Sequence, residues 1–392
     1  MASGSPYMPE QQRALLNGPA ATPPPGVQPN FEHPKNLWTT GTVVEILMLS
    51  LATIHIMMRL YTRRFIVGQI ALEDYAIFCG WGIFCGYFAV GWRATQIAPG
   101  IHQWDLQLKY LGDFLYQIHV GAVIYGICIL CIKTSILLQY LHIFVPTKKP
   151  DTMYWTCHGL IWLNTIFYII ASFTEIFACS PMAKAWDPLI SGGHCITVFD
   201  LNVVESSINA LTNIVILVLP QISIWNLQMS KKRKLQVSLI FLVGILACVS
   251  SIVHLFYTCK LLTATDVTYN SWLTGLWTYP ELGSGIMIAS LPVSGKFYQN
   301  LKEKTRSLLG KKSQLDHFRG QGSLHPSSGT RSRTWLAANY ATLSDENHVI
   351  SNATAVRSDR AGGDRRYNKH QDMQNNPRGI FVMRDIEITE EV

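Results

Sequence analysis

Seven apolar stretches, each long enough to cross a lipid bilayer, occupy the middle of this chain between polar segments. A membrane-spanning helix needs about 20 predominantly apolar residues. Hydrocarbon offers backbone N–H and C=O groups no partners, so each stretch must satisfy these groups within itself as a helix. The sequence therefore predicts an all-α membrane protein, a seven-transmembrane-helix bundle. Its predicted spans are residues 37–60, 71–93, 118–143, 154–178, 202–225, 236–259 and 272–294.

The segments on either side of this predicted transmembrane domain, residues 37–294, are polar. Residues 1–36 contain a Pro-rich run and no apolar periodicity, so we expect a disordered extracellular tail without a cleavable signal peptide. Residues 295–312 place apolar side chains on one helical face, which predicts an amphipathic juxtamembrane helix. Residues 313–392 are rich in Ser, Gly, Asn, Asp and Arg, and we expect a disordered cytosolic tail.

Lysine and arginine are concentrated in alternate loops of the predicted bundle. Basic residues gather on the cytosolic side of membrane proteins. We therefore expect the N-terminus outside and the C-terminus in the cytosol. The net charge of +7 follows from this bias and needs no nucleic-acid partner. The basic loops follow the first, third and fifth spans and hold Arg63 and Arg64, Lys148 and Lys149, and Lys231–Lys234.

The chain has nine cysteines, most of them within the predicted spans, where a thiol behaves as a small apolar group. Cys179 and Cys195 differ, because both fall in the loop between the fourth and fifth spans, on the oxidising face of the membrane. We expect them to form a disulfide, which the chain-entropy model values at roughly 3 kcal/mol. Two unpaired loop thiols are the alternative.

Charged residues also occur within and at the ends of the spans. At the cytosolic edge we expect Arg59 or Arg63 to pair with Asp74, a solvated helix start being the alternative. Lys133 and Glu281 lie at similar depth in mid-bilayer, where an unpaired charge is costly. We expect a bridge between them, with either a functional or a purely architectural role. Further candidates for ligand-binding or switch residues are Glu45, Glu175, Glu205, Asn209 and Asn213.

Several short motifs follow one another through the predicted bundle. They are Ile132–Leu138 with Tyr140 and Phe144, Cys179-Ser180-Pro181, Trp186-Asp187-Pro188, Leu219-Pro220, Trp277 with Glu281, and Leu291-Pro292. In this order they resemble the fungal rhodopsin-domain family of seven-helix integral membrane proteins. The resemblance implies a receptor-like fold. Members of that family include proteins linked to surface sensing and pathogenicity, and others encoded beside secondary-metabolite pathways.

Three positions depart from the pattern of that family. His142 stands where the family usually has Arg at the end of the third span. Asn213 replaces a usual Asp, and His254 replaces a usual Arg. The resemblance therefore implies an Asn–His pair in place of an Asp–Arg pair, if the fifth and sixth helices touch. His254 joins the switch candidates for this reason.

Other classes of seven-helix protein fit less well. A retinal-binding rhodopsin needs a lysine in the middle of the last span, but Lys296 lies only at the exit of that span. A seven-helix zinc hydrolase needs His and Asp ligands near one membrane face, whereas the histidines here are scattered in depth. We therefore expect no enzyme, no catalytic residues, no metal and no cofactor.

Two functions remain. In the first, which we favour, the chain is a receptor-like sensor in the plasma membrane. Lys133, Asn209, Asn213 and Glu281 would read an unknown small ligand and signal to a cytosolic partner. That partner would bind the 227–235 loop and the C-terminal tail. In the second, the chain is a membrane carrier or accessory protein of a secondary-metabolite biosynthetic pathway.

Overall fold

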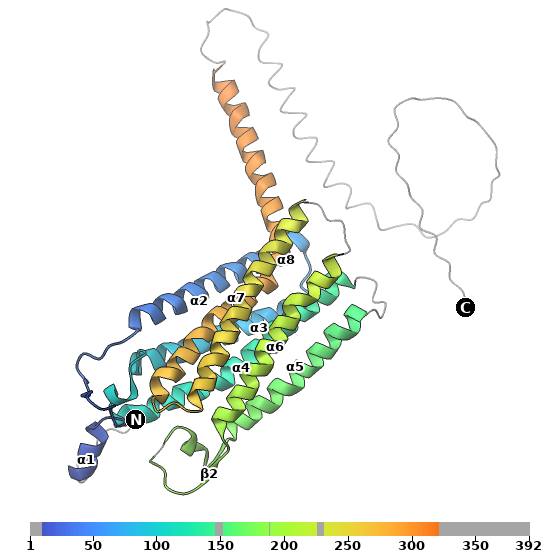
Figure 1. The fold of residues 1–392 in the computed structure, drawn as a ribbon. Coiled ribbons are helices and arrows are strands. Elements are labelled where there is room, and N and C mark those ends of the chain that lie inside the picture. Colours follow the sequence, from blue (N-terminus) through green and yellow to red (C-terminus); the bar gives the residue numbers. More distant parts are fainter. Residues whose placement is uncertain (1–9, 146–151, 188, 226–230, 321–392) are drawn as a thin grey trace, which may run out of the picture. The chain divides into compact units, whose positions relative to one another are not determined.

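The structure is a computed structural model that describes residues 10–145, 152–187, 189–225 and 231–320. The chain divides into two units after Gln314, and the bundle and the candidate site belong to the first. Long helices lie side by side in this unit (Figure 1). The helices are α1 (Glu10–Asn17), α2 (Trp38–Tyr61), α3 (Leu72–Ile97), α4 (Leu108–Phe144), α5 (Thr152–Ile176), α6 (Val198–Trp225), α7 (Lys231–Leu261) and α8 (Val267–Gly320).

Short elements connect the long helices. A π-helical turn, Thr62–Val67, continues α2 and ends at Gly68, whose φ of 75° is a conformation that glycine adopts readily. Between α5 and α6, the two-residue strands β1 (Cys179–Ser180) and β2 (His194–Cys195) pair antiparallel. The 3₁₀ turns are Gln103–Asp105 and Met182–Ala185.

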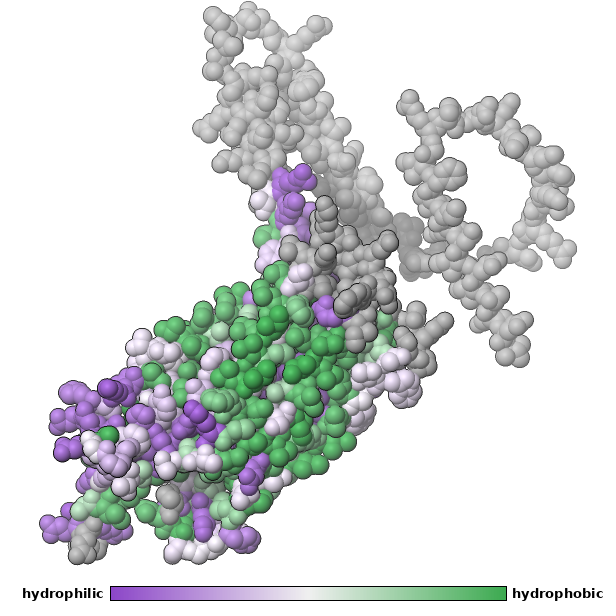
Figure 2. All heavy atoms as spheres, in the orientation of Figure 1, coloured by the Kyte–Doolittle hydropathy of each residue, from purple (hydrophilic) through white to green (hydrophobic). Residues whose placement is uncertain are grey.

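Within the described ranges, six helical segments are long and apolar enough to cross a membrane. The chain is therefore an all-α, multi-pass membrane protein. Large apolar side chains cover the outside of the bundle, and they dominate the face seen in Figure 2. On α7, Leu242 and Phe256 are 64% and 54% exposed, a surface that lipid tails cover in a membrane. The six segments are Trp38–Val67, Leu72–Ile97, Leu108–Phe144, Thr152–Ile176, Val198–Gln221 and Ser238–Leu261.

Helix α8 contains the predicted seventh span but is not among these six segments. Residues 278–290 of α8 are all buried, and Ser284 and Ser290 are among them. Gly285 allows α8 to approach α4, because a Cβ at this position would lie 2.7 Å from Cγ2 of Ile132. Small and weakly polar residues suit a helix surrounded by other helices. This central position explains why α8 is less apolar than the helices that face lipid.

The N-terminal segment differs from the expected disordered tail. Residues Glu10–Asn17 form α1, and the segment after it pairs with the connection between α3 and α4. The N–H of Ala20 donates to the carbonyl of Leu106 at 2.8 Å, and that of Leu108 donates to the carbonyl of Gly18 at 3.0 Å. Local composition misses this order because the hydrogen-bond partners lie far away in the sequence.

The C-terminal side differs from the prediction in a second way. The expected juxtamembrane helix, residues 295–312, is not a separate element, since α8 continues without a break through Gly320. Its lysines and leucines follow the buried part of α8 in the same helix. The remainder of the expected tail, residues 321–392, lies outside the described residues, as do residues 227–230 of the expected partner loop, whose residues 231–235 form the start of α7.

Candidate functional site

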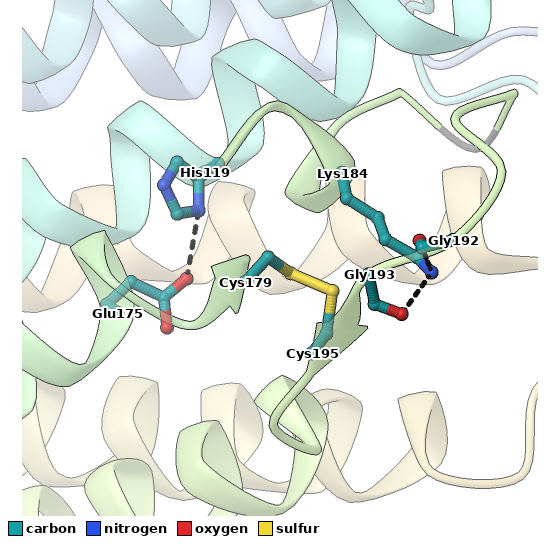
Figure 3. Close-up of a disulfide and its surroundings, with 7 residues drawn as sticks. All are labelled: His119, Glu175, Cys179, Lys184, Gly192, Gly193 and Cys195. Carbon is teal, nitrogen blue, oxygen red and sulfur yellow. Dashed lines mark hydrogen bonds and ion pairs between the residues drawn. A yellow bond between two sulfur atoms is a disulfide. The ribbon is translucent and has the colours of Figure 1, made fainter. Parts of the chain in front are cut away.

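A disulfide holds the connection between α5 and α6. Cys179 and Cys195 face each other across the β1–β2 pair and are bonded, which confirms the predicted bridge (Figure 3). Lys184 donates to the carbonyl of Gly192 at 2.6 Å, inside the closed loop. Glu175 lies close to the disulfide at the end of α5, where one of its oxygens is 3.5 Å from Nδ1 of His119. The disulfide and the Lys184 bond hold the loop closed, and the Trp186 ring of this loop packs against Tyr116 and His119 of α4.

Lys133 of α4 lies in the middle of the bundle and is 1% exposed. Its Nζ donates to Oδ1 of Asn209 at 2.6 Å and to Oγ1 of Thr212 at 2.5 Å. The Tyr168 hydroxyl of α5 lies 3.4 Å from the same nitrogen. The ammonium group is therefore surrounded by oxygen acceptors from two neighbouring helices.

Glu281 of α8 is 1% exposed and accepts hydrogen bonds from donors on two helices, α4 and α6. It accepts hydrogen bonds from the Tyr125 hydroxyl at 3.0 Å, from Nδ2 of Asn209 at 2.5 Å and from Nδ2 of Asn213 at 2.7 Å. Nδ1 of His254, on α7, is 3.6 Å from Oε2, the oxygen that accepts from Tyr125, while the two Asn amides donate to Oε1. Three donors and a nearby imidazole thus surround the carboxylate.

The direct bridge predicted between Lys133 and Glu281 is wrong. Asn209 stands between the two charges, since its Oδ1 accepts from Lys133 while its Nδ2 donates to Glu281. Asn213 and His254, the expected Asn–His pair, both lie against Glu281. We call this set of residues the Lys133–Glu281 network. Its members are Tyr125, Lys133, Tyr168, Asn209, Thr212, Asn213, His254 and Glu281.

A large cavity lies on one side of this network, toward the start of α6 and the end of α7. It encloses about 1020 Å³ of space, counted out to the solvent at its mouth. Tyr125 and His254 belong both to its wall and to the network. Glu45 and Glu205 also line it, together with Tyr87, Phe199, Trp272 and Tyr279.

A small cavity lies on the other side of the network. Its volume is about 550 Å³, counted out to the solvent at its mouth, and it is lined by residues of α4, the second half of α6, the first half of α7 and the first half of α8. Lys133, Asn213 and Glu281 contribute its polar wall, and Pro220 of α6 is among its apolar lining. The network therefore separates two cavities along the length of the bundle.

A second cluster of buried charge joins α2 and α3 at the end of the bundle remote from the disulfide. Nη2 of Arg59 is 2.6 Å from Oδ1 of Asp74, and both side chains are 0% exposed. Arg63 contacts Asp74 at 3.0 Å and Glu73 at 2.9 Å. These contacts confirm the predicted pairing. Nη1 of Arg59 also donates to the backbone carbonyl of Ala289, which ties the cluster to α8.

The predicted site residues thus fall into three groups. Lys133, Asn209, Asn213, His254 and Glu281 converge in one network. Glu45 and Glu205 line the large cavity, and Glu175 lines neither cavity. Sequence reasoning missed Tyr125, Tyr168 and Thr212. A signal existed for Thr212, because it follows Asn209 by three residues and so lies on the same face of α6.

The functional groups of this site do not form a metal centre. In the part of the chain that the structure describes, no group of three or more His, Cys, Asp or Glu side chains is placed to hold a metal ion. What the arrangement offers is a buried hydrogen-bond network between two cavities. The hydrogen bonds of such a buried network polarise one another, so a change at one member affects the others.

Comparisons with known proteins identify a family and several relatives. The model of the fungal rhodopsin domain matches residues 58–300. A SAT4 family membrane protein of Emericella nidulans is 31% identical over 70% of this chain and 68% of its own. Fugralins biosynthesis cluster protein 2 of Gibberella zeae is 30% identical over 71% of this chain and 70% of its own. Receptor GIN3 of Arthrobotrys oligospora is 23% identical over 68% of this chain and 64% of its own. No solved structure matches.

Proposed function

Because this chain belongs to the fungal rhodopsin domain family, we propose that it is a receptor-like sensor in the plasma membrane. All seven long helices cross the bilayer, α8 being the last, with the N-terminus outside and the C-terminus in the cytosol. The basic loops of the sequence support this orientation. A small molecule enters the large cavity from outside and is bound there without being chemically changed. One relative carries the name of a receptor.

One observation carries this proposal: the wall of the large cavity is continuous with the Lys133–Glu281 network. Tyr125 lines the cavity and also donates to Glu281 at 3.0 Å. A ligand that moves the Tyr125 ring therefore alters the hydrogen bonds of a buried carboxylate. The free energy of that change is on the order of 1 kcal/mol per hydrogen bond, enough to shift a two-state equilibrium several-fold.

Helix α8 provides the connection from the network to the opposite end of the bundle. Glu281 and Ala289 lie on the same helix, about 12 Å apart at 1.5 Å per residue. The carbonyl of Ala289 accepts a hydrogen bond from Arg59, which also pairs with Asp74. A shift or rotation of α8 at Glu281 therefore reaches the Arg59 contact. Small movements of packed helices are a common form of switching. A cytosolic partner at the 227–235 loop and the C-terminal tail would read the change.

A second function, a carrier of a pathway metabolite, is favoured by the small cavity. A carrier needs a binding region that opens in turn to each side, and two cavities separated by a closed polar network have the geometry of one such state. Two relatives are named for biosynthesis clusters. Purified protein in liposomes would show net movement of a pathway product if this second function holds, and none if the protein only senses.

Deletion of the encoding gene in the source organism separates the two functions. Paired transcript and metabolite profiles are recorded for the deletion strain and the parent. A sensor predicts a broad change in transcripts without accumulation of any compound inside the cells. Accumulation of one metabolite inside the cells, with transcripts otherwise steady, would support the carrier and overturn the receptor.

Strains complemented with point variants connect this result to the structure. Tyr125→Phe removes the hydroxyl between the large cavity and Glu281, so it should not restore the transcript profile. Tyr140→Phe is a matched control, because Tyr140 is also buried on α4 but lines only the small cavity. Full restoration by Tyr125→Phe would remove the network from the signalling path.

A further inference from the structure

The wall of the large cavity has an unusual balance of charge for a site in a membrane. Two carboxylates line it, whereas no lysine or arginine is among the residues that line it. We infer that the large cavity takes an organic cation, a compound with a protonated amine or quaternary ammonium group beside an apolar body. This inference rests on the proposed ligand-binding role of the cavity. The five aromatic rings of the wall are Tyr87, Tyr125, Phe199, Trp272 and Tyr279.

Glu45 is the first carboxylate of the cavity wall, and it has a free acceptor. It lies on α2 and is 2% exposed. One oxygen accepts a hydrogen bond from Thr95 at 3.1 Å, and Thr95 in turn is held by Nε1 of Trp272 at 3.2 Å. The other oxygen, Oε2, is buried without a hydrogen-bond partner among the described residues. A buried acceptor of this kind is costly unless a donor or a cation is supplied.

Glu205 is the second carboxylate, on the α6 side of the cavity. Within the described ranges it forms no hydrogen bond and no ion pair within 4.0 Å. Lys133 is the basic side chain buried in the neighbouring network, and its donors are directed at Asn209 and Thr212. In the part of the chain that the structure describes, no cation pairs with Glu205 within 4.0 Å, and the charge of Lys133 acts on it only from a greater distance. A ligand ammonium group would provide a close cation, since ionisable groups inside membranes gain most from an opposite charge.

The aromatic rings of the wall provide the second half of a cation site. The ring centroid of Tyr87 is 5.2 Å from that of Tyr279 and 6.5 Å from that of Tyr125, so the three rings form a continuous surface. The Tyr279 hydroxyl is buried without a hydrogen-bond partner in the described structure. Ring faces attract cations within about 6 Å, most strongly where water is excluded. Aromatic walls also bind the apolar body of an organic amine.

A histidine, His254, also faces this cavity, and it lies on α7. Its ring meets that of Tyr125 edge-on at 5.3 Å, and its Nδ1 lies 3.6 Å from Glu281. The acidic group behind it offsets any positive charge on the imidazole. The electrostatic balance of the wall is therefore acidic, which discriminates against anionic ligands and favours cations.

The test compares three compounds of one skeleton and different charge: phenethylamine, phenethyl alcohol and phenylacetate. The full-length protein is reconstituted in lipid nanodiscs, and the thermal unfolding midpoint is measured against the concentration of each compound. The inference predicts stabilisation by the amine at concentrations where the alcohol and the acid have no effect. Equal effects of the three compounds, a preference for the acid, or no effect of the amine would overturn it.

Variants place the effect in the cavity. Glu45→Gln and Glu205→Gln keep the shape of each side chain and remove its charge. Each should therefore lower the affinity for phenethylamine by about tenfold or more. Glu175→Gln is the matched control, a buried carboxyl of the same bundle that does not line the cavity, and it should bind as the parent does. Unchanged affinity in both cavity variants would overturn the assignment.

The same variants separate this inference from the proposed function. If Glu205→Gln restores the transcript profile of the deletion strain while Tyr125→Phe does not, the protein senses a ligand that is not a cation. If the deletion itself leaves transcripts unchanged and one metabolite accumulates, the sensing function fails. Amine binding in nanodiscs would then still define the class of compound that the cavity carries.

Discussion

The bundle contains two clusters of buried charge that are built in different ways. Arg59 and Asp74 touch directly at 2.6 Å, with both side chains 0% exposed. Lys133 and Glu281 are equally buried but are separated by the amide of Asn209. A direct pair has one low-energy arrangement, whereas a bridged pair has partners that can be exchanged. The Arg59 cluster therefore joins α2, α3 and α8 directly, while the Lys133–Glu281 network lies between two cavities.

The largest effect on stability is expected at the direct pair. Asp74→Ala leaves the Arg59 guanidinium buried without its carboxylate, which costs about 3–5 kcal/mol of unfolding free energy. Reversible unfolding of the purified protein in detergent measures this loss. The double variant Arg59→Met with Asp74→Leu should recover most of it, because no unpaired charge remains. If the single variant were as stable as the parent, the cluster would not have the structural role assigned here.

A smaller effect is expected at the bridged pair. Asn209→Leu removes the amide between Lys133 and Glu281 but leaves Thr212 on the lysine and Asn213 on the carboxylate. We expect a loss of about 1–3 kcal/mol in the same unfolding measurement. A loss as large as that of Asp74→Ala would show that the two clusters are held equally tightly.

Asn164→Leu is the matched control for Asn209→Leu. Asn164 is also a buried amide of the bundle, 2% exposed, but it donates only to the carbonyl of Leu160 in its own helix. Its Oδ1 has no hydrogen-bond partner in the described structure. Replacing it should therefore change the unfolding free energy little. A large loss at this position would mean that any buried amide is costly to replace, whatever its partners.

The contrast between the clusters also shows how far the sequence alone could lead. Arg59, Arg63 and Asp74 lie at the facing ends of two consecutive helices, so their pairing followed from adjacency along the chain. The separation of Lys133 from Glu281 depends on how α4, α6 and α8 are rotated about their axes. Hydropathy and depth in the membrane do not determine this rotation. The sequence therefore places Asn209 among the residues of the site but does not predict that it lies between Lys133 and Glu281.

Two features of the fold repeat this lesson. The disulfide was predictable because Cys179 and Cys195 share one short loop. The order of the N-terminal segment was not, since its partners at Leu106 and Leu108 are remote in sequence. The central position of α8 had a signal in Ser284 and Ser290, which are polar for a span and turned out to be buried inside the bundle.

Removal of the Tyr125 hydroxyl, at the edge of the network, should lower the unfolding free energy less than Asn209→Leu does. Its clearer effect should be on the transcript profile of the complemented strain. Tyr125→Phe removes the donor to Glu281 and the acceptor of the Asn209 amide, at 3.0 and 2.8 Å. The expected loss of unfolding free energy is about 1 kcal/mol. Tyr279→Phe should cost little, because that hydroxyl has no partner among the described residues. Equal losses of unfolding free energy in the two variants would show that the network contacts of the Tyr125 hydroxyl do not contribute to stability.

The smallest effect is expected at the exposed margin of the Arg59 cluster. His142 lies 3.5 Å from Glu73 and is 63% exposed, whereas Arg63 contacts the same carboxylate at 2.9 Å and is 11% exposed. Exposed pairs contribute at most about 1 kcal/mol, because water screens them. We therefore expect His142→Ala to change the unfolding free energy by less than this amount. A loss near that of Asp74→Ala would show that exposed residues at the edge of the cluster also contribute to its stability. The distinction between the direct pair and the bridged pair would then depend on the Asn209→Leu result alone.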